Sequence, residues 1–114
     1  MTQRLVVAIT GASGAIYGIR LLQLLRENSQ IETHLVLSLP AHLTLAQETD
    51  LQASDLSALA DVVYEPGDIA APIASGSFVV AGMVVAPFSI KTLSAIANSY
   101  ANDLISRAAD VQLK

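Results

Sequence analysis

The sequence predicts a three-layer α/β/α fold of the Rossmann-like kind, in which one parallel β-sheet carries helices on both faces. Uninterrupted apolar runs at residues 5–10 and 82–87 are typical of strands that are buried on both faces. Segments with helical periodicity alternate with the strand-like runs along the chain. This alternation indicates βαβ units, which build parallel sheets. With 114 residues, the chain has the length of one domain, residues 1–114.

A tight turn of small residues separates the first predicted strand from the first predicted helix. Residues 5–10 read LVVAIT, and Gly11-Ala12-Ser13-Gly14 follows them. Residues 15–26 predict a helix, because apolar side chains recur there at three-residue steps: Ile16, Ile19, Leu22 and Leu25. The order of strand, turn and helix opens a βαβ unit.

The later elements continue this alternation. Pro40 is placed where the first turn of a helix tolerates proline. The elements expected after the first helix are a strand at 33–38, a helix from residue 40 to about 49, a loop with a short helix at 51–60, a weaker strand at 61–64, the strand at 82–87, and helices at 90–99 and 102–113.

Composition excludes several classes of function. The chain has no cysteine, which excludes disulfides and thiolate metal sites. Its formal net charge is -4, so it lacks the basic surface on which nucleic-acid binding depends. A small anionic ligand is still compatible with this composition. His34 and His42 have no spacing partners for a metal, so no metal site is predicted.

Hydrophobic residues make up 53% of the chain, yet no apolar run reaches the roughly 20 residues that span a bilayer. The N-terminus runs directly into the first strand and lacks a signal-peptide pattern, so we expect a cytoplasmic protein. Apolar residues beyond the needs of a small core favour a homo-oligomer, because large exposed apolar patches are uncommon on monomers.

Small and hydroxyl-bearing residues follow three of the predicted strands: Gly11-Ala12-Ser13-Gly14, then Ser38, then Ser89 with Thr92. In a parallel sheet these strand ends share one edge, so we expect the three turns to meet at one crevice. Backbone N–H groups and helix N-termini there suit an anion or the edge of a flavin.

The first turn is neither a dinucleotide fingerprint nor a Walker loop. Ser13 and Ile16 replace two glycines of G-x-G-x-x-G, and no Gly-Lys-Ser/Thr follows. A turn without a ligand is therefore an open alternative. Ser89 is equally compatible with a simple N-cap of the helix that follows it. The segment Ala74-Ser75-Gly76-Ser77 is compatible either with an ordinary loop or with a loop that closes over a ligand.

Glu48 and Asp50 lie at the predicted C-terminal end of the second helix, where negative charge is unfavourable. Such a placement suggests function, although a solvated helix end explains it too. A serine hydrolase is disfavoured, because the first turn lacks the last glycine of G-x-S-x-G.

Taken together, the motifs resemble the UbiX-type flavin prenyltransferases, also described as partner subunits of aromatic acid decarboxylases. The resemblance covers essentially the whole chain. The segments that carry it, in order, are Thr10-Gly11-Ala12-Ser13-Gly14-Ala15, Glu48-Thr49-Asp50, Ala74-Ser75-Gly76-Ser77, Lys91-Thr92-Leu93-Ser94-Ala95-Ile96-Ala97 and Arg107-Ala108-Ala109-Asp110-Val111.

The resemblance implies a flavodoxin-like, FMN-binding fold assembled into trimers or dodecamers. It also implies transfer of a dimethylallyl group from dimethylallyl monophosphate to N5 of reduced FMN, followed by ring closure through C6 and without a metal. The prenylated FMN would serve a UbiD-type decarboxylase of ubiquinone or phenolic acid metabolism.

By the same resemblance, the residues expected to contact FMN are Gly11, Ala12, Ser13, Ser38, Ser89, Ile90, Lys91 and Thr92. Ser13 and Glu48 match catalytic positions of the family. Glu48 corresponds to a carboxylate near the prenyl phosphate, and we expect such a carboxyl to have a raised pKa.

Some positions depart from the family pattern. Leu39 replaces a usual lysine, and Phe88 a usual cysteine. The family also continues beyond residue 114 with further ligand-binding residues, so we expect a C-terminally incomplete protein whose activity is in question. Two alternatives stay open: an FMN-dependent cysteine decarboxylase, which has Pro-Ala-Ser-Ala-Asn-Thr where this chain has Pro87-Phe88-Ser89-Ile90-Lys91-Thr92, and a non-catalytic flavin-binding or assembly module.

Overall fold

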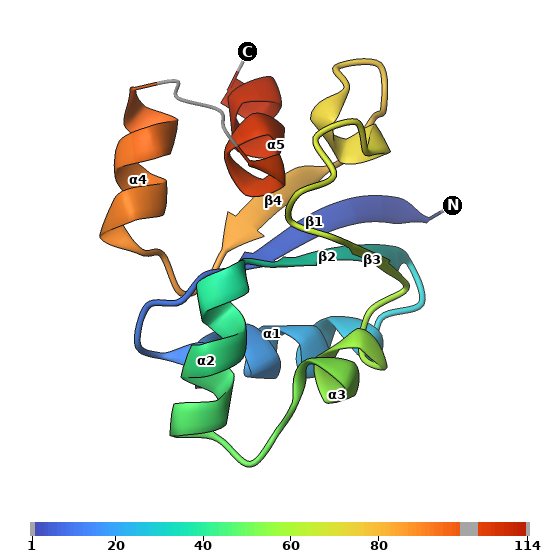
Figure 1. Cartoon of the computed structure of the whole chain (residues 1–114). Helices are drawn as coiled ribbons and strands as arrows, with labels where there is room; N and C mark the ends of the chain where they lie inside the picture. Colours follow the sequence, from blue (N-terminus) through green and yellow to red (C-terminus); the bar gives the residue numbers. More distant parts are fainter. Residues whose placement is uncertain (1, 99–102, 114) are drawn as a thin grey trace.

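Four strands form one parallel sheet in the computed structural model, which describes residues 2–98 and 103–113 (Figure 1). Their order across the sheet is β3-β2-β1-β4, so β1 lies between β2 and β4. The strands are β1 (Gln3–Ile9), β2 (Ile31–Leu37), β3 (Val62–Tyr64) and β4 (Gly82–Val85).

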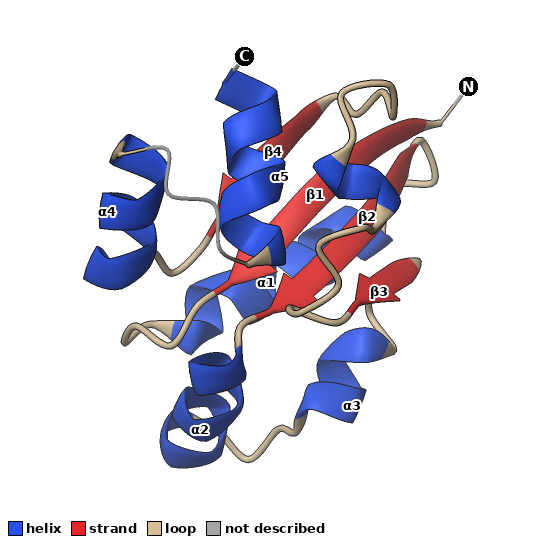
Figure 2. Ribbon diagram, turned by 45° about the horizontal axis from the view of Figure 1, so that its top comes forward, coloured by secondary structure: helices blue, strands red, loops and turns tan. Residues whose placement is uncertain are grey.

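Helices cover both faces of this sheet, which confirms the predicted three-layer α/β/α architecture (Figure 2). One face carries α1 (Ala15–Arg26), α2 (Leu39–Glu48) and α3 (Ala53–Ser57). The other carries the 3₁₀ helix η1 (Pro72–Ala74) and α5 (Leu104–Leu113). The remaining helix, α4 (Ile90–Ala97), has no buried residue and contacts α5.

The two cores follow from the alternation of side chains along β1 and β2. Val7 and Ile9 of β1 face the layer that contains α1 and α2, whereas Val6 and Ala8 face the layer that contains η1 and α5. All four side chains are at most 1% exposed. Burial on both faces explains why this strand reads as a continuous apolar run.

Element positions agree with the prediction, and the ends of the strands and long helices differ from it by at most two residues. The helix 15–26 has its predicted bounds, and Pro40 lies in the first turn of α2 as expected. The structure begins β1 and β2 two residues earlier than predicted and ends β4 two residues earlier. The predicted helix ends at residues 99 and 102 lie outside the described residues.

None of the helices in residues 2–98 and 103–113 has both the length and the apolar character needed to cross a membrane.

Candidate functional site

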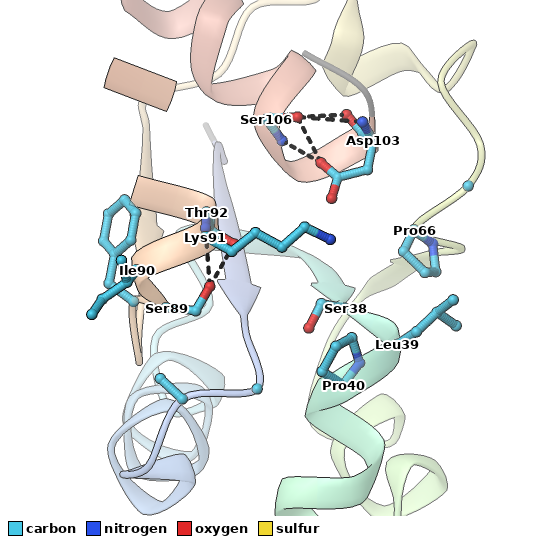
Figure 3. A pocket seen from close by; sticks show the side chains of 14 residues that line it. Ser38, Leu39, Pro40, Pro66, Ser89, Ile90, Lys91, Thr92, Asp103 and Ser106 are labelled. Atoms are coloured by element: carbon cyan, nitrogen blue, oxygen red, sulfur yellow. Dashed lines mark hydrogen bonds between the residues drawn. The ribbon is translucent and has the colours of Figure 1, made fainter. Parts of the chain in front are cut away.

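A cavity of about 640 Å³ opens at the carboxyl ends of the strands (Figure 3). Four segments that follow strands line it: Gly11 and Ala12 after β1, residues 38–40 after β2, Pro66 and Gly67 after β3, and residues 88–92 after β4. Asp103 and Ser106 at the start of α5 complete the wall. The predicted meeting of the three turns is therefore present.

Hydrogen bonds join the ends of β1, β2 and β4. The Thr10 hydroxyl donates to the carbonyl of Pro87 at 2.6 Å. The Ser38 N–H donates to the carbonyl of Ile9 at 2.9 Å. These bonds hold the turns after β2 and β4 against the end of β1, so the cavity wall has a fixed frame.

Gly11 is in close contact with the first turn of α2. The Thr44 hydroxyl donates to the Gly11 carbonyl at 2.6 Å. A Cβ at Gly11 would lie only 2.5 Å from Cβ of Pro40. Glycine is therefore required here by close packing between two turns, and not by a left-handed backbone.

The turn after β4 places hydroxyls and a cation at the cavity. The Ser89 side chain caps α4 by accepting from the Thr92 N–H at 3.1 Å, and it donates to the Thr92 hydroxyl at 2.8 Å. Figure 3 shows the Lys91 side chain extending across the cavity. Ser38 likewise caps α2, accepting from the Ala41 N–H at 3.2 Å. Two helix N-termini thus open on the same space, an arrangement that suits an anion.

Glu48 has a role that the sequence did not indicate. Its Oε1 accepts from the N–H groups of Gly14 and Ala15, both at 3.0 Å, at the start of α1. Gly14, the N-cap residue of α1, adopts φ 101° and has no side chain to cap the helix. The last residue of α2 therefore supplies the missing cap for α1.

This contact overturns the expectation of a raised Glu48 pKa. The N–H groups of Ala15 and then Gly14 hold the pKa of Glu48 below its ordinary value, with a further contribution from the Ser13 side chain. Desolvation acts in the opposite direction and is outweighed. The negative charge at the end of α2 is thus offset by the N-terminus of α1.

Seven of the predicted contact residues line the cavity: Gly11, Ala12, Ser38, Ser89, Ile90, Lys91 and Thr92. Ser13 and Glu48 do not line it; they lie together at the start of α1, next to the cavity-lining Ala12. The loop 74–77 precedes β4 and is adjacent to the C-terminal half of α5, at the opposite end of the sheet.

Sequence reasoning missed Pro66, Gly67, Asp103 and Ser106. Pro66 and Gly67 follow a predicted strand, so the rule applied to the other three strands would have found them. Asp103 and Ser106 are three residues apart, which is the spacing between the N-cap residue of a helix and the third residue of that helix. The Pro66 carbonyl accepts from the Leu104 N–H at 2.9 Å, which fixes the start of α5 beside this loop.

Within the described parts of the chain, no three His, Asp or Glu side chains gather as a metal ion would require. His34 is buried and its two ring nitrogens contact Tyr64 Oη at 2.9 Å and Glu32 Oε1 at 2.6 Å.

A protein-family model described as Flavoprotein matches residues 1–114. The chain belongs to the flavoprotein family. Flavin prenyltransferase UbiX of Escherichia coli K12 is 59% identical over 112 residues, an alignment that covers 98% of this chain and 59% of the relative. These similarities confirm the resemblance to UbiX-type proteins.

Solved structures of UbiX-type proteins are also similar to this chain. A crystal structure of AnUbiX (PadA1) in complex with FMN and dimethylallyl pyrophosphate matches with a TM-score of 0.96 and 51% identity, covering 99% of this chain and 60% of that one. A dodecameric FMN-dependent UbiX-like decarboxylase from Escherichia coli O157:H7 matches with a TM-score of 0.94 and 51% identity, covering 96% and 60%. The chain thus spans about six tenths of the length of these relatives.

Proposed function

We propose that this chain, residues 1–114, is the FMN-binding part of a flavin prenyltransferase, which transfers a dimethylallyl group from dimethylallyl monophosphate to reduced FMN. The observation that carries the proposal is the cavity where four strand ends meet, in a flavoprotein-family chain that is 59% identical to UbiX of Escherichia coli K12. The similarity to prenyltransferases favours this activity over the cysteine decarboxylase.

The side chains present fit a flavin nucleotide. Phe88, Ile90, Leu39 and Pro40 offer apolar surface for a flat ring system. The Thr92 hydroxyl, which Ser89 holds in place, and the first-turn N–H groups of α4, together with Lys91, offer donors for a phosphate. Reduced FMN would supply the nucleophilic nitrogen that accepts the prenyl group.

Ser13 and Glu48 are the proposed catalytic residues of this chain. Glu48 would handle protons as the prenyl phosphate departs, and Ser13 would lie near the reacting atoms. Their position beside the cavity-lining Ala12 supports this assignment. The fixed donors at the cavity would stabilise the departing phosphate.

The product, prenylated FMN, would serve a UbiD-type decarboxylase, as in ubiquinone biosynthesis, in the cytoplasm. A homo-oligomer, a trimer or dodecamer, is proposed because large apolar side chains are exposed; among them are Tyr17 (72%), Ile90 (85%) and Leu93 (53%). The dodecameric relative supports this assembly.

The direct test supplies purified protein with reduced FMN and dimethylallyl monophosphate under anaerobic conditions. Mass spectrometry of the flavin is expected to show the gain of one prenyl unit. FMN binding without that gain would contradict the enzyme assignment and favour a non-catalytic flavin-binding module. Absence of FMN binding would contradict the proposal as a whole.

Thr92→Val tests the phosphate cradle without removing the helix cap, because the Ser89 side chain still accepts from the residue 92 N–H. Loss of a charge-assisted hydrogen bond costs roughly 1.5–3 kcal/mol. FMN affinity, measured by fluorescence titration, should fall accordingly. Ser94→Ala, on the same helix but outside the cavity, is the matched control and should bind FMN normally. Unchanged affinity in Thr92→Val would remove this hydroxyl from the site.

A further inference from the structure

Asp103 presents a carboxylate of fixed orientation at the cavity. The Ser106 N–H donates to its Oδ1 at 2.8 Å, and the Ser106 hydroxyl donates to the same oxygen at 2.7 Å. Ser106 is itself only 2% exposed, so the donors cannot easily move. The carboxylate is therefore held in one direction by a buried partner.

The second carboxylate oxygen of Asp103 points elsewhere. Within residues 2–98 and 103–113, the hydrogen bonds that this carboxylate accepts are made by its Oδ1 atom. Figure 3 shows the other oxygen directed into the cavity, toward the space that the Lys91 side chain also enters. An ionised carboxylate can only accept hydrogen bonds, so this part of the wall selects for a donor.

The cavity is thus electrically polar. The N-terminus of α4 favours negative charge on one side of the cavity, whereas the Asp103 carboxylate disfavours it at the start of α5, where the Lys91 side chain also reaches. A flavin nucleotide has matching parts: an anionic phosphate, and neutral donors in the ribityl hydroxyls and the N3–H of the ring.

We propose that Asp103 is a ligand-binding residue that accepts a hydrogen bond from a neutral donor of the flavin and directs the phosphate toward α4. This inference rests on the proposed function and adds a residue to its site. Capping of α5 uses one oxygen of the carboxylate, and ligand recognition uses the other.

Asp103→Asn separates the two roles. Asparagine caps helices about as well as aspartate, so the Oδ1 bonds to Ser106 persist and the melting temperature should match that of the wild type. The amide NH₂ replaces the acceptor in the cavity with a donor. FMN and riboflavin should then bind roughly 10- to 100-fold more weakly. Asp68→Asn, in an exposed loop outside the cavity, is the matched control and should leave both affinities unchanged.

Lumiflavin distinguishes the two kinds of donor, because it keeps the ring N–H and lacks the ribityl chain. Weakened lumiflavin binding in Asp103→Asn supports recognition of the ring N–H. Unchanged lumiflavin binding with weakened riboflavin binding supports recognition of a hydroxyl. If Asp103→Asn binds FMN as tightly as the wild type, the inference is overturned and the proposed function is untouched. If the wild-type protein binds none of the three flavins, the proposed function itself is overturned, and the inference with it.

Discussion

Glu48 connects the end of α2 with the start of α1. It ends α2, and its carboxylate accepts from two N–H groups that begin α1. The N-terminal end of α1 is therefore already occupied by a protein anion. The N-termini of α2 and α4 also open on the cavity and are available to a ligand phosphate.

Glu48→Gln keeps an acceptor oxygen and removes the charge. Because the folded pKa of Glu48 is lowered, its contribution to stability is present above the ordinary glutamate range and is lost as pH falls through the folded value. Thermal unfolding should show the variant less stable than the wild type at pH 7, with the difference shrinking in acid.

Turnover provides the second readout for the same variant. Prenyl transfer should slow while FMN affinity is retained, and Asp50→Asn, which removes a charge two residues away, should leave both unchanged. Release of FMN from Glu48→Gln would contradict the catalytic role and leave only the structural one.

Tyr64 predicts a second pH effect, at the alkaline end. Burial, and next the charge of Glu32, raise the pKa of Tyr64, and Arg4 partly opposes this. A raised folded pKa means that stability is present below about pH 10 and is lost as pH rises above it. Tyr64→Phe should show a smaller loss of stability between neutral and alkaline pH, whereas Tyr17→Phe, at an exposed position, should behave as the wild type. Identical alkaline profiles for Tyr64→Phe and the wild type would contradict this.

At the scale of elements, Gly18 sets how closely α1 approaches the sheet. A Cβ there would lie 2.5 Å from the carbonyl oxygen of Ala86 and 2.8 Å from Cδ1 of Ile9. Backbone at Ala86 cannot move without disturbing the turn that leads to the cavity. The small residue is thus required by the packing of α1 against β1 and against the residue that follows β4.

Gly18→Ala should destabilise the protein by about 1–3 kcal/mol in urea unfolding, in spite of the better helix propensity of alanine. Gly76→Ala is the matched control, because nothing lies within 4 Å of a Cβ at that position. Its stability should stay within about 0.5 kcal/mol of the wild type. A Gly18→Ala protein as stable as the control would show that α1 can shift outward at no cost.

Elements were more predictable than contacts between them. The bounds of α1 follow from its periodicity and from Gly14 before it, and β1 follows from burial on both faces. The bond between Glu48 and the start of α1 joins residues 34 positions apart, which no local pattern encodes. Asp103 lies outside the predicted site because the rule for parallel sheets points to residues that follow strands, whereas Asp103 caps a helix.

At the scale of the whole molecule, α4 differs from the other long helices. It supplies Ile90, Lys91 and Thr92 to the cavity, yet none of its side chains is buried. Few buried contacts favour local opening of such a helix. A ligand held by its first turn should restrain it.

Amide hydrogen exchange tests whether a bound ligand restrains α4. FMN should slow exchange in α4, with little change in α1, whose inward face is packed against the sheet. The same slowing in both helices would indicate general stabilisation instead.

The strand order has a consequence for synthesis of the chain on the ribosome. β1, β2 and β3 are made before β4, and β4 pairs with β1. Until β4 has emerged, the backbone N–H and C=O groups along one side of β1 lack their partner strand. The nascent chain therefore passes through a period in which one side of β1 can pair with a foreign strand, and that hazard ends only when β4 has left the ribosome.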